Sequence, residues 1–257
     1  MSYLNKKELK IFLDEKAEKY NTVSFIESDP IQTPHLFSKK EDCEIAGFLS
    51  ATIAWGNRTM IINNSKRMME LMDHAPYDFV MNHTESDLES LEGFVHRTFK
   101  SIDFQYFTRS LKNIYEHHQG LESVLLPKDD EVDYQFAIAN FKEVFFELPH
   151  QRRTQKHISN PLKNSAAKRI SMFLRWMVRQ DKTGVDLGIW HTHSTSKLSC
   201  PLDVHTGNIA RKLKIIKRKQ NDWKTVKELD KTLRKFDPED PVKYDFALFG
   251  LGVFEKF

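Results

Sequence analysis

The chain has 257 residues, of which 40% are hydrophobic and 12% aromatic, and its formal net charge is only +3. This composition supplies enough apolar surface for a hydrophobic core, so it excludes a chain that is disordered as a whole. The two cysteines exclude a disulfide framework and a four-thiolate zinc or iron–sulfur site. Nine glycines and nine prolines are few for this length, which favours helices over a many-turned β architecture.

No apolar run approaches the roughly 20 residues that a membrane span needs, and the first ten residues lack the apolar stretch of a secretory signal. We therefore expect a cytoplasmic protein without a membrane partner.

The charge is unevenly distributed, because residues 148–221 hold sixteen Lys or Arg but three acids. Such a segment is typical of a surface that attracts a polyanion, although a solvated basic helix face would have the same composition.

Hydrophobic periodicity predicts a succession of amphipathic helices in the first 150 residues. The predicted helices cover residues 6–20, 41–55, 59–72, 103–118 and 132–148. The second of these is nearly free of charge after Glu44, so we expect it to be central and buried. Residues 126–130 have the composition of a turn, and residues 150–160 that of a polar, basic loop.

The remainder of the chain carries three further helix signals. An apolar stripe from Ile170 to Val178 predicts a helix over residues 165–178, with Ser165 as its N-cap. Asp203 occupies the N-cap position of a helix over residues 204–215, and the Asp-Pro pairs in residues 236–241 begin a terminal helix. Because no alternating run of strand length occurs, the sequence predicts an all-α fold.

Several of these segments resemble a known family. The stretch Pro201-Leu202-Asp203-Val204-His205, followed by the letters NIARKL at 208–213, resembles the segment that holds the catalytic aspartate of helix-hairpin-helix DNA glycosylases. Residues 48–52 (FLSAT) are similar to a stretch of the endonuclease III branch. The thirty-five positions between Lys168 and Asp203 are closer to the spacing in the archaeal 8-oxoguanine glycosylases.

The sequence also departs from that family and resembles another. The glycosylase hairpin has two glycines before its lysine, whereas residues 160–168 (NPLKNSAAK) contain none, and the cluster-binding cysteines of endonuclease III are absent. The letters FLRWMVR and FDPEDPVKYDFALFG are similar to a bacterial family of conserved proteins of unknown function. This second resemblance implies no activity.

The glycosylase resemblance implies both a fold and a set of site residues. The fold is a single all-α unit over residues 1–257, with one helical lobe at about 30–150, a second at about 151–257 that includes the N-terminal helix, and a cleft between them. The implied catalytic residues are Lys168 and Asp203. The implied base pocket consists of Trp55, Thr52, Trp190 and Trp176, and the implied DNA contacts are Lys163, Arg169, Arg211, Lys212, Lys217 and Arg218.

The resemblance further implies base-excision repair of damaged double-stranded DNA. The Lys168 amine would attack C1′ of an oxidised nucleotide such as 8-oxoguanine, expel the base and form a Schiff base, after which β-elimination nicks the strand. Asp203 would stabilise positive charge on the sugar and lie near the amine without a tight ion pair. We expect no metal, since His191 and His193 have no third ligand nearby, and no cofactor.

Two other classes of function remain open on the sequence. Lys168 could be an ordinary surface lysine and Asp203 only an N-cap, and the missing hairpin glycines would suit a DNA-binding protein that retains the scaffold without the chemistry. A protein-interaction module is the third possibility. In each case we expect a monomer, associated with the nucleoid if it binds DNA.

Overall fold

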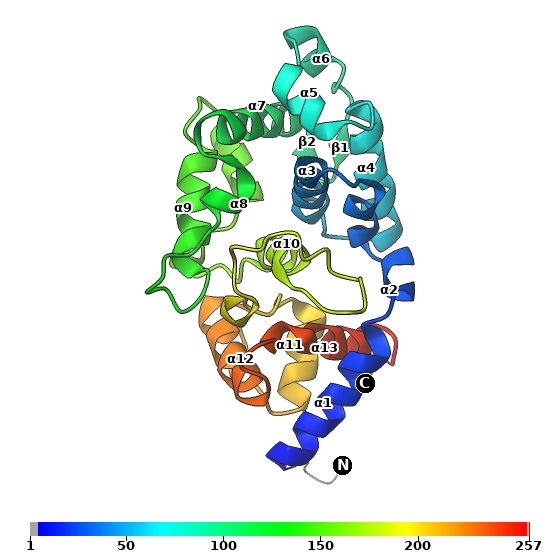
Figure 1. Cartoon of the computed structure of the whole chain (residues 1–257), viewed down its shortest axis with the longest axis vertical. Helices are drawn as coiled ribbons and strands as arrows, with labels where there is room; N and C mark the ends of the chain where they lie inside the picture. The colour runs from blue at the N-terminus through cyan, green and yellow to red at the C-terminus, as the bar shows by residue number, and fades with distance from the viewer. Residues whose placement is uncertain (1–4, 256) are drawn as a thin grey trace.

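The computed structural model of the chain describes residues 5–255 and 257 (Figure 1). The unit expected over residues 1–257 therefore includes residues 1–4 and 256, which lie outside the described part. The chain is predominantly helical, which confirms the all-α prediction at this level. None of the helices in the described ranges combines the length and the apolar character needed to cross a membrane.

The first nine helices come from the N-terminal 145 residues. They are α1 (Lys6–Tyr20), α2 (Ser24–Glu27), α3 (Lys40–Thr52), α4 (Arg58–Leu71), α5 (Pro76–Asn82), α6 (Glu85–Glu89), α7 (Ser101–His117), α8 (Gly120–Val124) and α9 (Gln135–Phe145). Two short strands, β1 (Val95–His96) and β2 (Phe99–Lys100), pair antiparallel before α7. The 3₁₀ helices η1 (Pro30–Gln32) and η2 (Pro34–Leu36) lead into α3.

Four α-helices form the rest of the chain: α10 (Lys168–Val178), α11 (Val204–Lys212), α12 (Trp223–Phe236) and α13 (Tyr244–Val253). Short 3₁₀ helices connect them: η3 (Arg152–His157), η4 (Pro161–Lys163), η5 (Thr195–Lys197) and η6 (Pro241–Lys243). In Figure 1, α3 to α9 lie in the upper part, α1 and α11 to α13 lie in the lower part, and α10 lies between them. The N-terminal helix therefore packs with the C-terminal helices.

A cluster of phenylalanines joins α10 to the upper helices. Phe48 of α3 stacks on Phe107 of α7 and meets the ring edges of Phe141 in α9 and Phe173 in α10 at centroid distances of 5.6–5.8 Å. These side chains are fully buried. Aromatic pairs of this kind contribute about 0.5–1.5 kcal/mol each beyond the area they bury. This cluster fixes α10 and the residues at its N-terminus relative to α3.

The contact between α1 and α13 depends on Gly250. A Cβ atom at Gly250 would lie 2.1 Å from Cδ2 of Tyr20, whose ring stacks on Phe254. In an unconstrained helix, Gly→Ala stabilises by about 1 kcal/mol. Here the added methyl group would instead push the α1 helix away from α13.

We expect Gly250→Ala to lower the free energy of unfolding by about 1–3 kcal/mol, measured by urea denaturation, because overpacking forces side chains and backbone to shift. The same change in a Tyr20→Ala background should cost much less, since the clashing ring is gone. Equal losses in both backgrounds would show that Tyr20 is not the cause.

The sequence analysis missed α12 and the β1–β2 pair, and it placed the start of α10 wrongly. Ser165 is not the N-cap of α10: the helix begins at Lys168, after Ala167 with a φ of +50°. The Ser165 hydroxyl instead accepts from the backbone N–H of Ala167, and Ser165 forms a β-bridge with Asp222. The predicted helix over 132–148 is shorter, and η3 lies in the predicted loop at 150–160.

α12 buries a carboxyl group against the chain before α11. Asp230 is 2% exposed, and one carboxylate oxygen accepts from the backbone N–H of Cys200 at 3.0 Å. The other oxygen lies 3.7 Å from the Arg234 guanidinium. Burial raises the pKa of Asp230 to about 6, and the Arg234 charge opposes this shift.

Because the pKa of Asp230 is higher in the folded than in the unfolded chain, folding takes up a proton. The contribution of this group to the free energy of unfolding is therefore fully present below the unfolded pKa, near 4, and is lost as the pH rises to about 6. Asp230→Asn keeps an acceptor for Cys200 and removes the charge. It should raise the free energy of unfolding at pH 7.5 by about 1–3 kcal/mol and change it little at pH 4. Urea denaturation at both pH values measures this, and a loss of stability at pH 7.5 would contradict it.

Candidate active site

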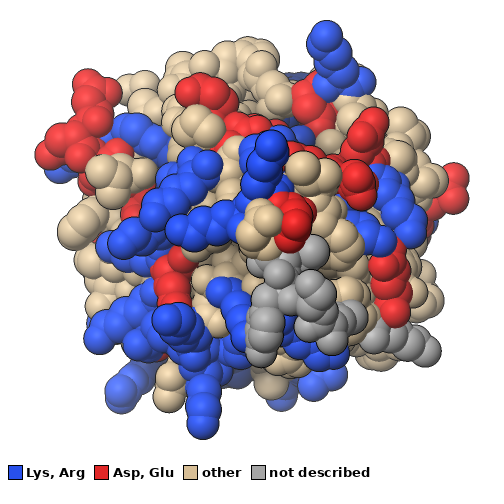
Figure 2. Space-filling model, turned by 90° about the horizontal axis from the view of Figure 1, so that it is seen from below, with Lys and Arg blue, Asp and Glu red and all other residues tan. Residues whose placement is uncertain are grey.

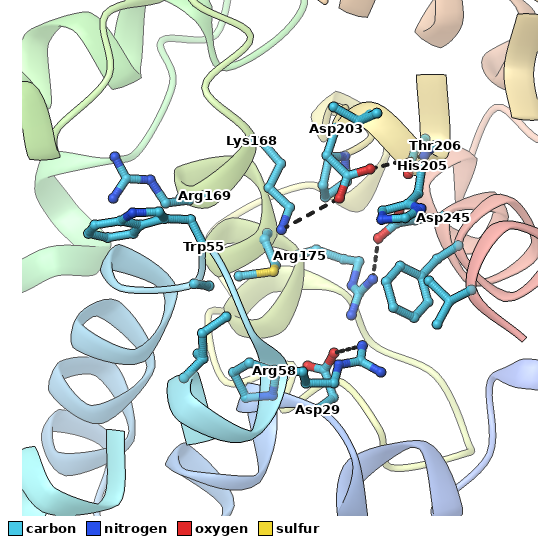
Figure 3. A pocket seen from close by; sticks show the side chains of 18 of the residues that line it. Asp29, Trp55, Arg58, Lys168, Arg169, Arg175, Asp203, His205, Thr206 and Asp245 are labelled. Carbon is cyan, nitrogen blue, oxygen red and sulfur yellow. Dashed lines mark hydrogen bonds and ion pairs between the residues drawn. The ribbon is translucent and has the colours of Figure 1, made fainter. Parts of the chain in front are cut away.

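A pocket of about 580 Å³ opens between the start of α4, the N-termini of α10 and α11, and one side of α13. Lys168, Arg169, Met172 and Arg175 of α10 line it along one side. Figure 3 shows these side chains with the others that face the pocket. A volume in this range is typical of a ligand site, so the pocket has room for a nucleotide-sized group.

Lys168 is the first residue of α10 and points into the pocket (Figure 3). The turn before it contains no glycine, yet Asn164 and Ala167 adopt left-handed backbone angles, with φ of +64° and +50°. In the described chain no side chain caps this helix end. The free backbone N–H groups of the first turn and the helix dipole therefore favour negative charge at this end of the pocket.

Asp203 faces Lys168 from the adjacent helix. It is the N-cap of α11, as predicted, and one carboxylate oxygen accepts from the backbone N–H of Thr206 at 3.0 Å. The other oxygen lies 3.8 Å from the Lys168 amine, which is beyond hydrogen-bond distance. Both side chains are partly buried, 29% exposed for Lys168 and 27% for Asp203. The structure thus brings together the two residues that the sequence singled out.

Further charged pairs line the pocket, and the sequence analysis did not identify them. Arg58 binds Asp29 at 3.0 Å on the wall opposite Lys168. On the pocket floor, the buried Arg175 donates to the Asp245 carboxylate. Burial raises the pKa of Asp245 to about 6 against the opposing charge of Arg175. Arginines inside an apolar helical run, as in FLRWMVR, were the signal that could have indicated such pairs.

Of the predicted base-pocket residues, only Trp55 lines this pocket. Trp190 and Trp176 are fully buried, and the Trp190 indole donates to the buried carboxylate of Glu44. Thr52 is also buried and lines a separate void of about 10 Å³, which is too small for a base. The predictions for Trp190, Trp176 and Thr52 are therefore wrong, because core packing uses these side chains.

Some of the predicted DNA contacts are exposed, and others are bonded to groups of the protein itself. Lys163, Lys212 and Lys217 are exposed, although the Lys212 amine donates to the carbonyl of Phe257. Arg211 is not free to bind a phosphate, because it donates to carbonyl groups of the loop after α11, and Arg218 pairs with Asp222. Figure 2 views the end of the molecule where α1 and α12 lie, and Lys and Arg side chains are densest at its lower left.

Arg169 lines the pocket beside Lys168, but its side chain is held within the protein. It donates to the carbonyl of Thr52, and its guanidinium lies over the Trp55 ring, 4.8 Å from the ring centroid. Trp55 also contacts the rings of His96 and His157. Of these side chains, Arg169 and Trp55 line the pocket.

Within the described ranges, no group of three or more His, Cys, Asp or Glu residues is arranged to hold a metal ion. The ionisable groups that line the pocket are an amine, three carboxylates, three guanidiniums and the His205 imidazole. Such a set can form a Schiff base, move protons and bind an anion.

The fold and the site define a class of protein: a predominantly helical chain whose pocket is lined by an amine and a facing carboxylate. Residues 29–254 match the family described as protein of unknown function (DUF2400), and the chain belongs to this family. No curated protein and no solved structure matches it.

The family match corrects the expected membership of the helix-hairpin-helix glycosylase superfamily, which was wrong. It agrees with the other resemblance, to a family of unknown function. The misleading motifs were short, and they have structural explanations: Asp203 is an N-cap, and FLSAT lies in the buried half of α3. Caps and small buried residues occur in helical proteins of many kinds.

Proposed function

We propose that this chain excises an oxidised base from double-stranded DNA and nicks the strand, with Lys168 as the nucleophile and Asp203 as the assisting carboxylate. The observation that carries this proposal is the 3.8 Å approach of the two groups inside a pocket of about 580 Å³. The proposal concerns the reaction and does not rest on membership of a glycosylase family.

In this reaction the neutral Lys168 amine forms a bond to C1′ of the nucleotide, and the bond from C1′ to the base breaks with the base leaving protonated. Opening of the sugar ring gives a Schiff base, and removal of a C2′ proton expels the 3′ phosphate. Asp203 is placed to stabilise positive charge on the sugar and to accept or return protons. At 3.8 Å the carboxylate oxygen is not hydrogen-bonded to the amine, so neither group is held by the other.

The arrangement of the helices supports the same proposal. Under it, α3 to α9 act as one lobe and α1 with α10 to α13 as the other, and the DNA strand enters the pocket between them (Figure 1). The phosphate backbone would pass the uncapped start of α10 and the exposed Lys163 of η4, which precedes it in the chain. Trp55 would form a wall against the extruded nucleotide.

Trapping with borohydride tests the proposal. The wild-type protein is incubated with duplexes that each contain one 8-oxoguanine, thymine glycol, uracil or abasic site, and borohydride reduces any Schiff base to a stable covalent bond. We expect an adduct with at least one oxidised base and with the abasic site. If none of these duplexes gives an adduct, the proposed reaction fails for these substrates.

A non-catalytic DNA-binding protein is the second candidate, favoured by the role of Asp203 as a helix cap and by the partial exposure of Lys168. It predicts DNA binding that weakens steeply with salt and is unchanged by Lys168→Gln. An absence of DNA binding at low salt would instead leave the protein-interaction module.

A further inference from the structure

Arg169 differs from the other two arginines of the pocket. Arg58 is paired with Asp29, and Arg175 is paired with Asp186 and Asp245. Arg169 has no carboxylate partner among the described residues, and its hydrogen bond goes to the backbone carbonyl of Thr52 through Nη1. The other N–H groups of the guanidinium have no acceptor in the described chain, and Arg169 is one of the residues that line the pocket.

A partly buried guanidinium without a counter-charge is unfavourable. Charged groups taken out of water are normally paired, because an opposite charge offsets the cost of desolvation. Burial lowers the pKa of Arg169 to about 10, which still leaves the group charged at neutral pH. The Asp203 carboxylate at the start of α11 does not supply this counter-charge, because its two oxygens face the Lys168 amine and the backbone N–H of Thr206.

The surroundings of Arg169 hold the guanidinium in one place. The Trp55 ring supports one of its faces, and the Thr52 carbonyl fixes Nη1. The uncapped first turn of α10 begins one residue earlier, so its backbone N–H groups and its dipole act in the same region. A fixed arginine fork with free N–H groups suits an oxyanion with at least two oxygens.

We propose that Arg169 forms a subsite for a phosphate group at the end of the pocket beside Lys168. The inference rests on the proposed function for the identity of the anion: it is the backbone phosphate that flanks the nucleotide whose sugar reaches Lys168. A free phosphate or a mononucleotide has the same oxyanion chemistry, so the experiment must separate these sources.

The test combines a protein variant with a DNA variant. The Lys168→Gln protein, which avoids turnover, is titrated with duplexes that carry a tetrahydrofuran abasic analogue and a neutral methylphosphonate in place of one flanking phosphate. We expect one of the two flanking substitutions to weaken binding about tenfold. In the Lys168→Gln/Arg169→Gln protein the same methylphosphonate should weaken DNA binding less than about twofold. The slope of log affinity against log salt should also fall by about one for this protein.

Controls separate a direct contact from a general loss of structure. Arg67→Gln replaces an exposed arginine on α4 outside the pocket and should leave the effect of the methylphosphonate on binding unchanged. Arg169→Lys keeps the charge and should restore part of the effect. If Arg169→Gln does not fold, as judged by circular dichroism, the methylphosphonate comparison with the Lys168→Gln protein and the Arg169→Lys variant still decides whether Arg169 binds a phosphate.

The outcomes are distinct. If Arg169→Gln weakens charged and neutral duplexes equally, Arg169 has only a structural role and the inference is overturned. If inorganic phosphate raises the melting temperature of the wild type but not of Arg169→Gln, while neither methylphosphonate changes DNA binding, the oxyanion subsite is supported and its assignment to DNA is overturned. If a methylphosphonate weakens binding as expected but no adduct forms in the trapping experiment, the subsite stands and the proposed reaction fails.

Discussion

Replacing Lys168 by Gln should abolish the borohydride-trapped adduct, lowering the rate of adduct formation by about 10³-fold or more, because glutamine has no nucleophilic amine to form a Schiff base. The fold should be retained. Among the described residues the amine pairs with Asp203 alone, at 3.8 Å, and such partly exposed ion pairs contribute less than about 1 kcal/mol.

The matched control for this substitution is Lys66→Gln, which removes an exposed lysine of α4 outside the pocket. It should leave adduct formation unchanged. An adduct that persists in Lys168→Gln would mean that another amine reacts, and the role given to Lys168 would then be wrong.

Asp203→Asn separates the two roles of this aspartate. Asparagine is as good an N-cap as aspartate, so the hydrogen bond to Thr206 and the stability of α11 should be retained. The substitution removes the negative charge beside Lys168, and the adduct rate should fall by about 10²- to 10⁴-fold, the usual contribution of a positioned acid or base. Unchanged kinetics would leave Asp203 as a helix cap alone.

Much of the helical fold could be predicted from the sequence, because most of the long helices have an apolar stripe that was recognised. The helix over 6–20 has the same bounds as α1, and the helices near α3, α4 and α7 begin or end within a few residues of their predicted limits. α12 was missed although its sequence has a typical signal: Asp222 caps the helix, and Val226, Leu229 and Leu233 form a buried stripe.

The start of α10 could not be predicted, because it depends on contacts distant in sequence. Ser165 has the side chain of an N-cap, but its β-bridge to Asp222 keeps the backbone extended at that point. Ala167 then takes a left-handed conformation that alanine rarely adopts. Tertiary packing therefore shifts the helix by three residues, and this shift places Lys168 at its first position.

The sequence indicated Lys168, Asp203, Trp55 and Arg169 but not the other residues of the pocket. Tryptophan type alone could not distinguish Trp55, which lines the pocket, from Trp190, which is fully buried and donates to Glu44. The acids that pair with the pocket arginines come from segments far apart in the chain, such as Asp29 and Asp245. Their roles depend on long-range packing, for which a single sequence carries no direct signal.

Behind the pocket, Asp186 joins two buried arginines of α10. Its carboxylate accepts from Nε of Arg175 at 3.1 Å and from Nη1 of Arg179 at 3.0 Å, and its side chain is fully buried. The same arginines reach Asp245 and Asp240, which lie in α13 and just before η6. This network ties the loop after α10 and the α13 segment to the helix that carries Lys168.

Asp186→Ala should lower the free energy of unfolding by about 3–5 kcal/mol, since it leaves two guanidiniums buried with fewer counter-charges. Urea denaturation at pH 7 measures the loss. The control is Glu85→Ala, which breaks the exposed pair with Arg109 and should cost less than about 1 kcal/mol. If both substitutions cost the same small amount, the buried network does not hold α10 in place, and the position of Lys168 must be fixed by the phenylalanine cluster alone.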